Sequence, residues 1–284
     1  MHRRHFLKAA AAVALLPRLA WPAQQPDQAS PFYVMDTWFW QAEKDLTIPD
    51  QIALIKKLGY AGLALSWGMQ HAERLAALKE AGLRTPGCYI VVDIDGPYPD
   101  HLKQCVTLLK GSGGLVWLAL TSKKHKRSDA AGDAAALDIL TRCADECKQS
   151  DVPGIALYPH VGFWMERMAD AIRLASQAKR PEIGVQFNQY HWMAADAGQD
   201  LSRTLEAARP YLKGVSINGS SKQPSILPLG EGDYDPAPIL KALVDLNYKG
   251  SISHQGYSIK GNLPQRLAAA KDAWDQINRK IRQP

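Results

Sequence analysis

The feature that most constrains the fold is an eightfold alternation of short apolar runs with longer amphipathic stretches, which begins at Phe32. Near-continuous apolar runs of this length are typical of parallel strands that are covered on both faces. The runs predict strands at 32–36, 61–66, 84–93 and 115–121, and four more at the sequences GIALY, IGVQFN, KGVSIN and GSISHQ. The stretches between them predict helices at 49–58, 70–81, 99–110, 130–148, 165–178, 201–208, 236–246 and 264–281.

Eight strand–helix units favour an α/β fold of one (β/α)8 TIM barrel with an eight-stranded parallel sheet. An open, doubly wound sheet shows the same alternation, but the first strand–helix turn carries no glycine-rich dinucleotide-binding sequence. Gly59, Gly82 and Gly250 lie where predicted helices give way to strands, which is the usual place of a C-terminal cap. We therefore assign residues 32–284 to one barrel domain, preceded by a short segment at 24–31.

Residues 1–23 predict an export signal and not a part of the barrel. Arg3 and Arg4 precede an apolar run at 9–16 that is too short to span a bilayer. The paired arginines followed by Phe-Leu-Lys resemble a twin-arginine signal, and an ordinary secretory leader is the alternative. We expect recognition by the twin-arginine export machinery, cleavage near 20–23, and a periplasmic or secreted protein without a stable membrane anchor.

The basic character of the whole sequence comes mostly from this leader. Its four basic residues are accompanied by no acid, so their removal lowers the formal net charge from +6 to +2. A near-neutral mature chain lacks the electrostatic support that binding to nucleic acid requires. We therefore expect no nucleic-acid partner.

Polar side chains follow most of the predicted strands. Because a barrel brings the carboxyl ends of its strands to one face, where active sites of this fold are built, we expect these side chains to meet there. Three are histidines, which can exchange a proton near neutral pH: His160, His191 and His254. The others are Asp36, Tyr158, Asn188, Asn218, Gln255 and Tyr257. Lys260, in the last loop, is expected to neutralise an enolate or an anionic group, and a solvated lysine is the alternative.

Tryptophans are also frequent at the predicted strand ends. Trp38, Trp67, Trp164 and Trp192 fall there, and Trp40 lies two residues past the first of them. Flat aromatic faces suit the apolar face of a sugar ring, although large aromatic residues also cap barrel cores. The pattern predicts a small-molecule carbohydrate as the ligand, with Trp38, Trp67 and Trp192 among the residues that bind it.

With these motifs the sequence resembles the xylose-isomerase-like sugar phosphate isomerase/epimerase superfamily. The resemblance covers nearly all of the chain after the leader. It is most specific in LYPHVGFWMERMADAIRLASQAKRPEIGVQFNQYHW, in PLGEGDYD and in GSISHQGYSIKG. It implies an eight-stranded barrel that holds a divalent metal with Glu, Asp, His and Glu from strands five to eight. The resemblance also implies proton transfer between neighbouring carbons of a ketose or aldose.

This sequence departs from the family pattern at the metal ligands. The corresponding positions are occupied by Tyr158, Asn188, Ser216 and Gln255. None is a carboxylate, and a neutral side chain brings no negative charge to hold a hard cation. We therefore favour no cofactor and predict no metal site of the family's usual kind. A site built from His160, His191 and His254, with a preference for softer metals, is the alternative.

The leading functional hypothesis is a periplasmic carbohydrate-active barrel that transfers a proton beside a carbonyl, as a sugar isomerase, epimerase or lyase does. Its substrate is expected to be a free or oxidised sugar or a glycoside. His160 and His191 serve as acid and base, Lys260 stabilises developing negative charge, and the other named residues bind the sugar. One alternative is a sugar-binding protein without catalysis. Another is a metal-dependent hydrolase or lyase of keto-sugars or glycosides.

Overall fold

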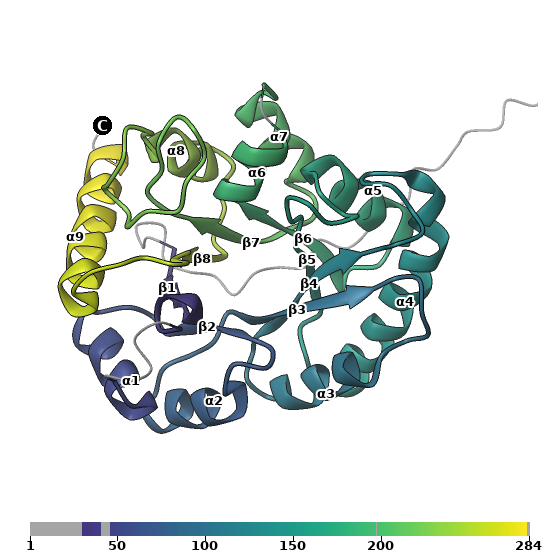
Figure 1. Ribbon diagram of the computed structural model, residues 1–284, viewed down its shortest axis with the longest axis horizontal. Helices are drawn as coiled ribbons and strands as arrows, with labels where there is room; N and C mark the ends of the chain where they lie inside the picture. The colour runs from purple at the N-terminus through teal and green to yellow at the C-terminus, as the bar shows by residue number, and fades with distance from the viewer. Residues whose placement is uncertain (1–29, 41–45, 197, 283–284) are drawn as a thin grey trace, which may run out of the picture.

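The chain forms a closed barrel ringed by helices (Figure 1). The computed structural model describes residues 30–40, 46–196 and 198–282. Eight parallel strands are hydrogen-bonded in the order of the sequence, and the first strand pairs with the last to close the ring. This confirms the predicted single (β/α)8 TIM barrel. The predicted export signal at 1–23 and the segment 24–29 lie outside the described residues.

All predicted strands are found, with bounds within three residues of those expected. They are β1 (Phe32–Met35), β2 (Leu63–Ser66), β3 (Gly87–Asp93), β4 (Leu115–Thr121), β5 (Ile155–Leu157), β6 (Ile183–Asn188), β7 (Leu212–Ile217) and β8 (Ser251–His254). Every residue of β1, β2, β5 and β6 is buried, which explains why these runs show no alternation of apolar and polar residues.

The eight predicted helices are found as well, together with one that the sequence did not predict. The α-helices are α1 (Ile48–Lys57), α2 (His71–Glu80), α3 (Asp100–Leu109), α4 (Asp133–Gln149), α5 (Met168–Ala178), α6 (Gln189–Ala195), α7 (Leu201–Ala208), α8 (Ala237–Asp245) and α9 (Leu263–Arg282). Short 3-10 turns precede α1 and α4: η1 (Asp36–Trp38) and η2 (Ala130–Gly132). The unpredicted helix is α6, which begins immediately where β6 ends. None of the described helices has the length and apolar character of a membrane span.

Two layers of apolar side chains form the core. The larger one joins the outer faces of the strands to the surrounding helices. The smaller one contains alternate strand residues, including Met35, Ala64, Trp117 and Tyr158, and it fills the barrel interior. Met35 and Tyr158 also line the pocket described below, so the interior layer extends to that pocket.

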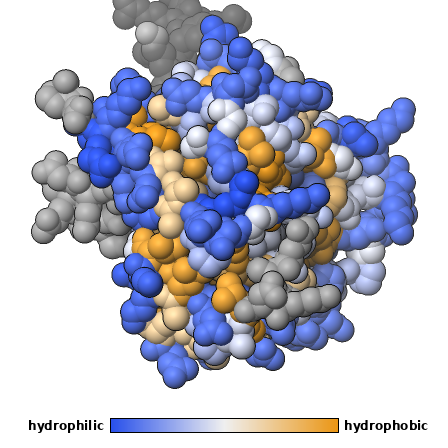
Figure 2. Space-filling model, turned by 60° about the vertical axis from the view of Figure 1, so that its left-hand side comes forward, coloured by the Kyte–Doolittle hydropathy of each residue, from blue (hydrophilic) through white to orange (hydrophobic). Residues whose placement is uncertain are grey.

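On the face in Figure 2, hydrophilic residues predominate and apolar residues show between them. Among the large apolar side chains of the described residues, only Val91, Val244 and Tyr257 count as exposed. Tyr257 is the most exposed of the three, at 52%. It follows β8 at the carboxyl end of the barrel, the end at which sites of this fold are built.

Candidate functional site

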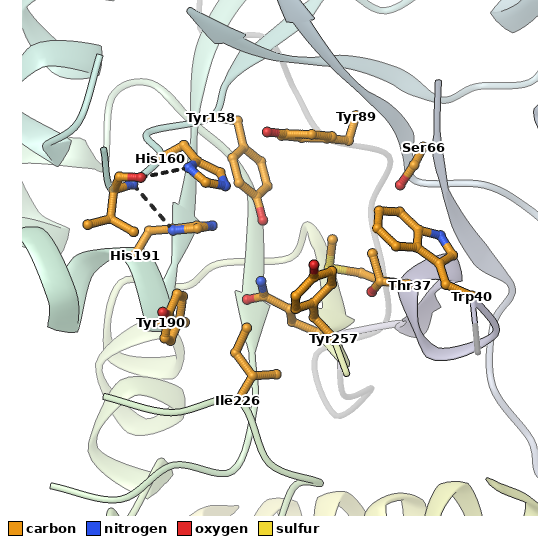
Figure 3. A pocket seen from close by; sticks show the side chains of 13 residues that line it. Thr37, Trp40, Ser66, Tyr89, Tyr158, His160, Tyr190, His191, Ile226 and Tyr257 are labelled. Carbon is orange, nitrogen blue, oxygen red and sulfur yellow. Dashed lines mark hydrogen bonds between the residues drawn. The ribbon is translucent and has the colours of Figure 1, made fainter. Parts of the chain in front are cut away.

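A pocket of about 430 Å³ lies at the carboxyl end of the strands (Figure 3). This volume falls within the range of small-molecule sites. Its lining residues come from six strands or the loops that follow them, together with Ile226 after β7. They are Met35, Thr37, Trp40, Ser66, Tyr89, Tyr158, His160, Val161, Tyr190, His191, Ile226, Gln255 and Tyr257. Among the lining residues that the structure describes there is no Asp, Glu, Lys or Arg.

His160 and His191 lie side by side on one wall of this pocket. His160 follows β5 and His191 belongs to α6, and their ring centroids are 4.0 Å apart with the planes inclined at 39°. Phe163 stacks on the His160 ring at 4.1 Å. The two predicted catalytic histidines are therefore brought together, although about thirty residues of sequence separate them.

The backbone of Val161 fixes which nitrogen of each neutral ring carries the proton. His160 Nδ1 lies 2.9 Å from the Val161 carbonyl oxygen, which can only accept a hydrogen bond. The Val161 N–H donates to His191 Nδ1 at 3.4 Å, so that nitrogen is unprotonated. His160 consequently has a bare Nε2 and His191 an Nε2–H. Figure 3 shows both of these second nitrogens directed into the pocket.

Burial keeps both imidazoles neutral. It lowers the pKa of His160, against a smaller opposing effect of the hydrogen bond to Val161. Burial lowers the pKa of His191 well below its usual value, and the nearby His160 adds to the decrease. At neutral pH the pair thus offers one ring that can take a proton and one that can donate a hydrogen bond.

The floor of the pocket is a hydrogen-bonded group of neutral side chains centred on Asn188. Its Oδ1 accepts from the backbone N–H of His191 at 3.0 Å, which caps the N-terminus of α6. Its Nδ2 donates to the Tyr158 hydroxyl at 2.5 Å and to Gln255 Oε1 at 2.9 Å. Burial raises the pKa of Tyr158, so its hydroxyl stays protonated. One side chain thereby links the floor to the helix that carries His191.

Aromatic rings form much of the remaining wall. Trp40 meets Tyr257 edge to face, with centroids 5.7 Å apart, and Tyr89 meets Tyr158 in the same way at 5.0 Å. Figure 3 shows Trp40 and Thr37 across the pocket from the histidine pair. A ligand between the two walls would have imidazole nitrogens on one side and an indole on the other.

Several predicted ligand-binding residues line the pocket, namely Tyr158, Gln255 and Tyr257, and Asn188 lies directly beneath it. The three predicted tryptophans do not line it. Each packs against another ring, with the distance given between ring centroids. Trp38 lies 4.7 Å from the buried His254, and Trp67 stacks on His71 at 4.1 Å. Trp192 lies 5.9 Å from Phe187. These three tryptophans therefore lie outside the pocket lining, because each packs against its own neighbours.

The structure also places four predicted polar residues outside the pocket lining. The buried Asp36 carboxylate accepts from the backbone N–H and the hydroxyl of Ser66, both at 2.7 Å. The Asn218 amide donates to the carbonyls of Gly219 and Ser225, at 2.6 and 3.0 Å, and so braces the loop after β7.

His254 and Lys260 are the other two. His254 Nε2 accepts the backbone N–H of Leu229 at 3.1 Å, and the ring is completely buried. Lys260 is exposed and is not among the residues that line the pocket. The structure therefore corrects the expectation that these side chains would meet at one site.

The separation of His254 also bears on the three-histidine metal site. His254 is buried among apolar rings, whereas His160 and His191 face the pocket. Within the described residues, no group of three or more His, Cys, Asp and Glu is arranged to hold a metal ion. At the family's four ligand positions stand a phenol, two amides and a hydroxyl, which do not fit a hard cation.

Sequence reasoning missed several residues of the pocket: Thr37, Ser66, Tyr89, Tyr190, Ile226 and Trp40. Trp40 was noted among the strand-end tryptophans but was not assigned to the site. Ser66 and Tyr89 lie within strands β2 and β3, so the alternation of faces along a strand was the available signal. Tyr190 belongs to α6, the helix that the sequence did not predict, and Ile226 lies in the irregular loop after β7.

Comparison with known proteins finds similar barrels both by sequence and by structure. The family model described as xylose isomerase-like TIM barrel matches residues 52–276. Among solved structures, the chain is similar to 3-keto-D-glucoside 4-epimerase from E. coli, with 16% identity, a TM-score of 0.69, and coverage of 88% of this chain and 100% of that one.

Two further solved structures are similar at comparable levels. L-ribulose 3-epimerase has 14% identity and a TM-score of 0.72, with coverage of 89% of this chain and 96% of that one. The IolI protein, solved with a bound zinc atom, has 14% identity and a TM-score of 0.72, with coverage of 89% and 100%. At these identities the likeness shows the fold alone. No curated protein sequence matches the chain.

Proposed function

Because this chain belongs to the xylose isomerase-like TIM barrel family, we propose that it binds an uncharged sugar and transfers a proton beside the carbonyl group. The reaction type is that of a sugar isomerase or epimerase. The observation that carries the proposal is the His160–His191 pair, in which a bare ring nitrogen and a ring N–H point into one pocket.

The composition of the pocket supports an uncharged substrate. Its described lining contains no Asp, Glu, Lys or Arg, so a phosphate or carboxylate would find no oppositely charged partner there. Aromatic rings such as Trp40 and Tyr257 suit the apolar face of a sugar. Two similar structures are named as epimerases of a keto-glucoside and of L-ribulose, which are sugars without a charged group.

In the proposed step, His160 Nε2 removes a proton from the carbon next to the carbonyl. The C–H electron pair becomes part of a carbon–carbon double bond, and the carbonyl π pair moves onto the oxygen. The Nε2–H of His191 donates a hydrogen bond to that oxygen as its negative charge grows. Return of the proton to the same face restores the substrate, whereas delivery of a proton to the opposite face of that carbon gives an epimer. Delivery to the former carbonyl carbon gives an isomer when the proton of the neighbouring hydroxyl group moves to the former carbonyl oxygen.

The test is deuterium incorporation from heavy water into bound sugars. We expect the wild-type protein to exchange a carbon-bound hydrogen of L-ribulose or of a 3-keto-D-glucoside, as followed by proton NMR. Calorimetry on the same sugars measures binding separately. Binding without any exchange would refute the catalytic part and leave a sugar-binding protein, which is the second candidate.

We also propose that the chain is exported by the twin-arginine machinery to the periplasm. The support is the Arg3-Arg4 pair ahead of the apolar run at 9–16. Residues 1–30 fused to a reporter should bring it to the periplasm, and replacing both arginines by lysine should retain it in the cytoplasm. Lys8→Arg is the matched control. Equal export with and without the arginine pair would contradict this route.

A further inference from the structure

The floor of the pocket occupies the place where the family resemblance implies a metal. A similar barrel was solved with zinc, and the corresponding side chains here are Tyr158, Asn188, Ser216 and Gln255. Whether they suit a cation depends on which of their atoms are turned toward one another. Hydrogen bonds to the backbone decide this.

Asn188 turns its amide nitrogen, and not its oxygen, toward the centre of the floor. A backbone N–H can only donate, so the atom that receives the His191 N–H must be Asn188 Oδ1. The Asn188 NH2 group therefore faces the Tyr158 hydroxyl and Gln255 Oε1, and both of its protons are used. A cation placed there would meet the N–H groups of Asn188 in place of the lone pairs of its carbonyl oxygen.

The same bonds determine what the floor presents to a ligand. Since Gln255 Oε1 accepts from Asn188, the Gln255 amide nitrogen and its two N–H groups remain available to the pocket that Gln255 lines. Tyr158 accepts from Asn188, and its hydroxyl points toward the middle of the pocket in Figure 3. Below them, Gln186 donates to Ser216 at 2.9 Å, so the layer underneath is neutral as well.

We propose that this floor is a hydrogen-bond-donor site that binds the carbonyl oxygen of the sugar in the place of a metal ion. Its donors are Gln255 Nε2–H, the Tyr158 hydroxyl and His191 Nε2–H. The inference rests on the proposed function, because it assigns the group that receives negative charge when His160 takes the proton. Donors fixed in advance by other hydrogen bonds stabilise such charge without having to reorganise.

The metal part is tested without a substrate. Protein purified without chelator or affinity metal should contain far less than one metal ion per chain, and Mn²⁺ should leave its melting temperature unchanged. Asn188→Asp/Gln255→Glu should bind one Mn²⁺ per chain, and chelator should reverse the accompanying rise in melting temperature, because two close carboxylates need a positive charge. The matched control is Asn247→Asp/Gln265→Glu, which makes the same changes at exposed positions and should gain no tight Mn²⁺ site.

The donor part is tested with Gln255→Leu, which also keeps the proposal testable if the double variant does not fold. This variant should bind L-ribulose about tenfold more weakly while its affinity for ribitol, which has no carbonyl, stays unchanged. Equal losses of affinity for L-ribulose and for ribitol would overturn the assignment of Gln255.

If the wild-type protein contains one metal ion per chain and chelation lowers its melting temperature, the donor site is overturned and the proposed reaction is left standing. Metal-free protein that binds the ketose through Gln255 yet exchanges no deuterium would overturn the reaction and leave the donor site standing.

Discussion

His160→Gln is expected to slow deuterium exchange into the bound sugar by about 10²–10⁴-fold, because glutamine offers no nitrogen lone pair to take a proton. The bare Nε2 of His160 is the proton acceptor that the described pocket wall presents beside the substrate. Sugar affinity should change by only a few-fold, since His191, the floor and the aromatic walls are retained. Exchange followed by NMR and affinity measured by calorimetry separate the two effects.

The pH profile gives this variant a second readout. The base form of His160 is the neutral ring, and burial lowers the pKa of that ring, so protonation begins only below the usual value of 6.5. In the wild type, the exchange rate should therefore decrease with falling pH only below pH 6.5. Any residual exchange rate of His160→Gln should lack this decrease. His101→Gln, on the outer helix α3, is the matched control and should keep both the rate and this decrease. A His160 variant as fast as this control would refute the assigned role.

The second large effect concerns stability in acid. His254 is completely buried, and burial lowers its pKa to about 3, whereas the unfolded chain has the ordinary value of 6.5. Between pH 6.5 and 3, His254 is protonated in the unfolded chain but stays neutral in the folded protein. The free energy of unfolding therefore falls as the pH decreases toward 3. One such group costs about 1.4 kcal/mol per pH unit, or about 2 kcal/mol between pH 7 and 5. The buried His191 adds loss of the same sign.

His254→Gln isolates this contribution. Glutamine can still accept the Leu229 N–H, but it does not titrate, so the stability lost between pH 7 and 5 should shrink by about 2 kcal/mol. The variant should also be less stable at pH 7, because the imidazole packs against Phe32 and Trp38. Urea unfolding at both pH values measures the difference, with His101→Gln as control. Parallel losses in wild type and variant would show that His254 does not govern the acid response.

The barrel could be predicted from sequence because its signal is repeated eight times. Each apolar run and each amphipathic stretch supplied the same information, and an error of three residues at one end did not alter the count. The helix α6 was missed because its seven residues, QYHWMAA, are too few to show a periodic pattern. Its N-terminal cap, Asn188, was interpreted as a ligand-binding residue, although its oxygen holds the helix.

The candidate site was predicted in part, and the errors concern how residues at and beyond the strand ends are oriented. Neighbouring residues of a strand face opposite sides, so His254 and Gln255 at the end of β8 could not both face the pocket. Gln255 lines it, and His254 packs against Phe32 in the outer layer. Trp38 ends the 3-10 turn that follows β1 and Trp40 lies two residues beyond it, where strand alternation no longer applies. The pocket is lined by Trp40 and not by Trp38, which the sequence prediction had assigned to it.

The Val161 contacts have an evolutionary consequence. The groups that distinguish the two histidines are a peptide N–H and a carbonyl, which every residue except proline supplies in full. Val161 can therefore be replaced by another residue with a backbone N–H without changing which ring nitrogen of His160 and of His191 carries the proton. Selection would act on the length and path of the Tyr158–Val161 connection, so this asymmetry would constrain the amino-acid identity at position 161 only by excluding proline.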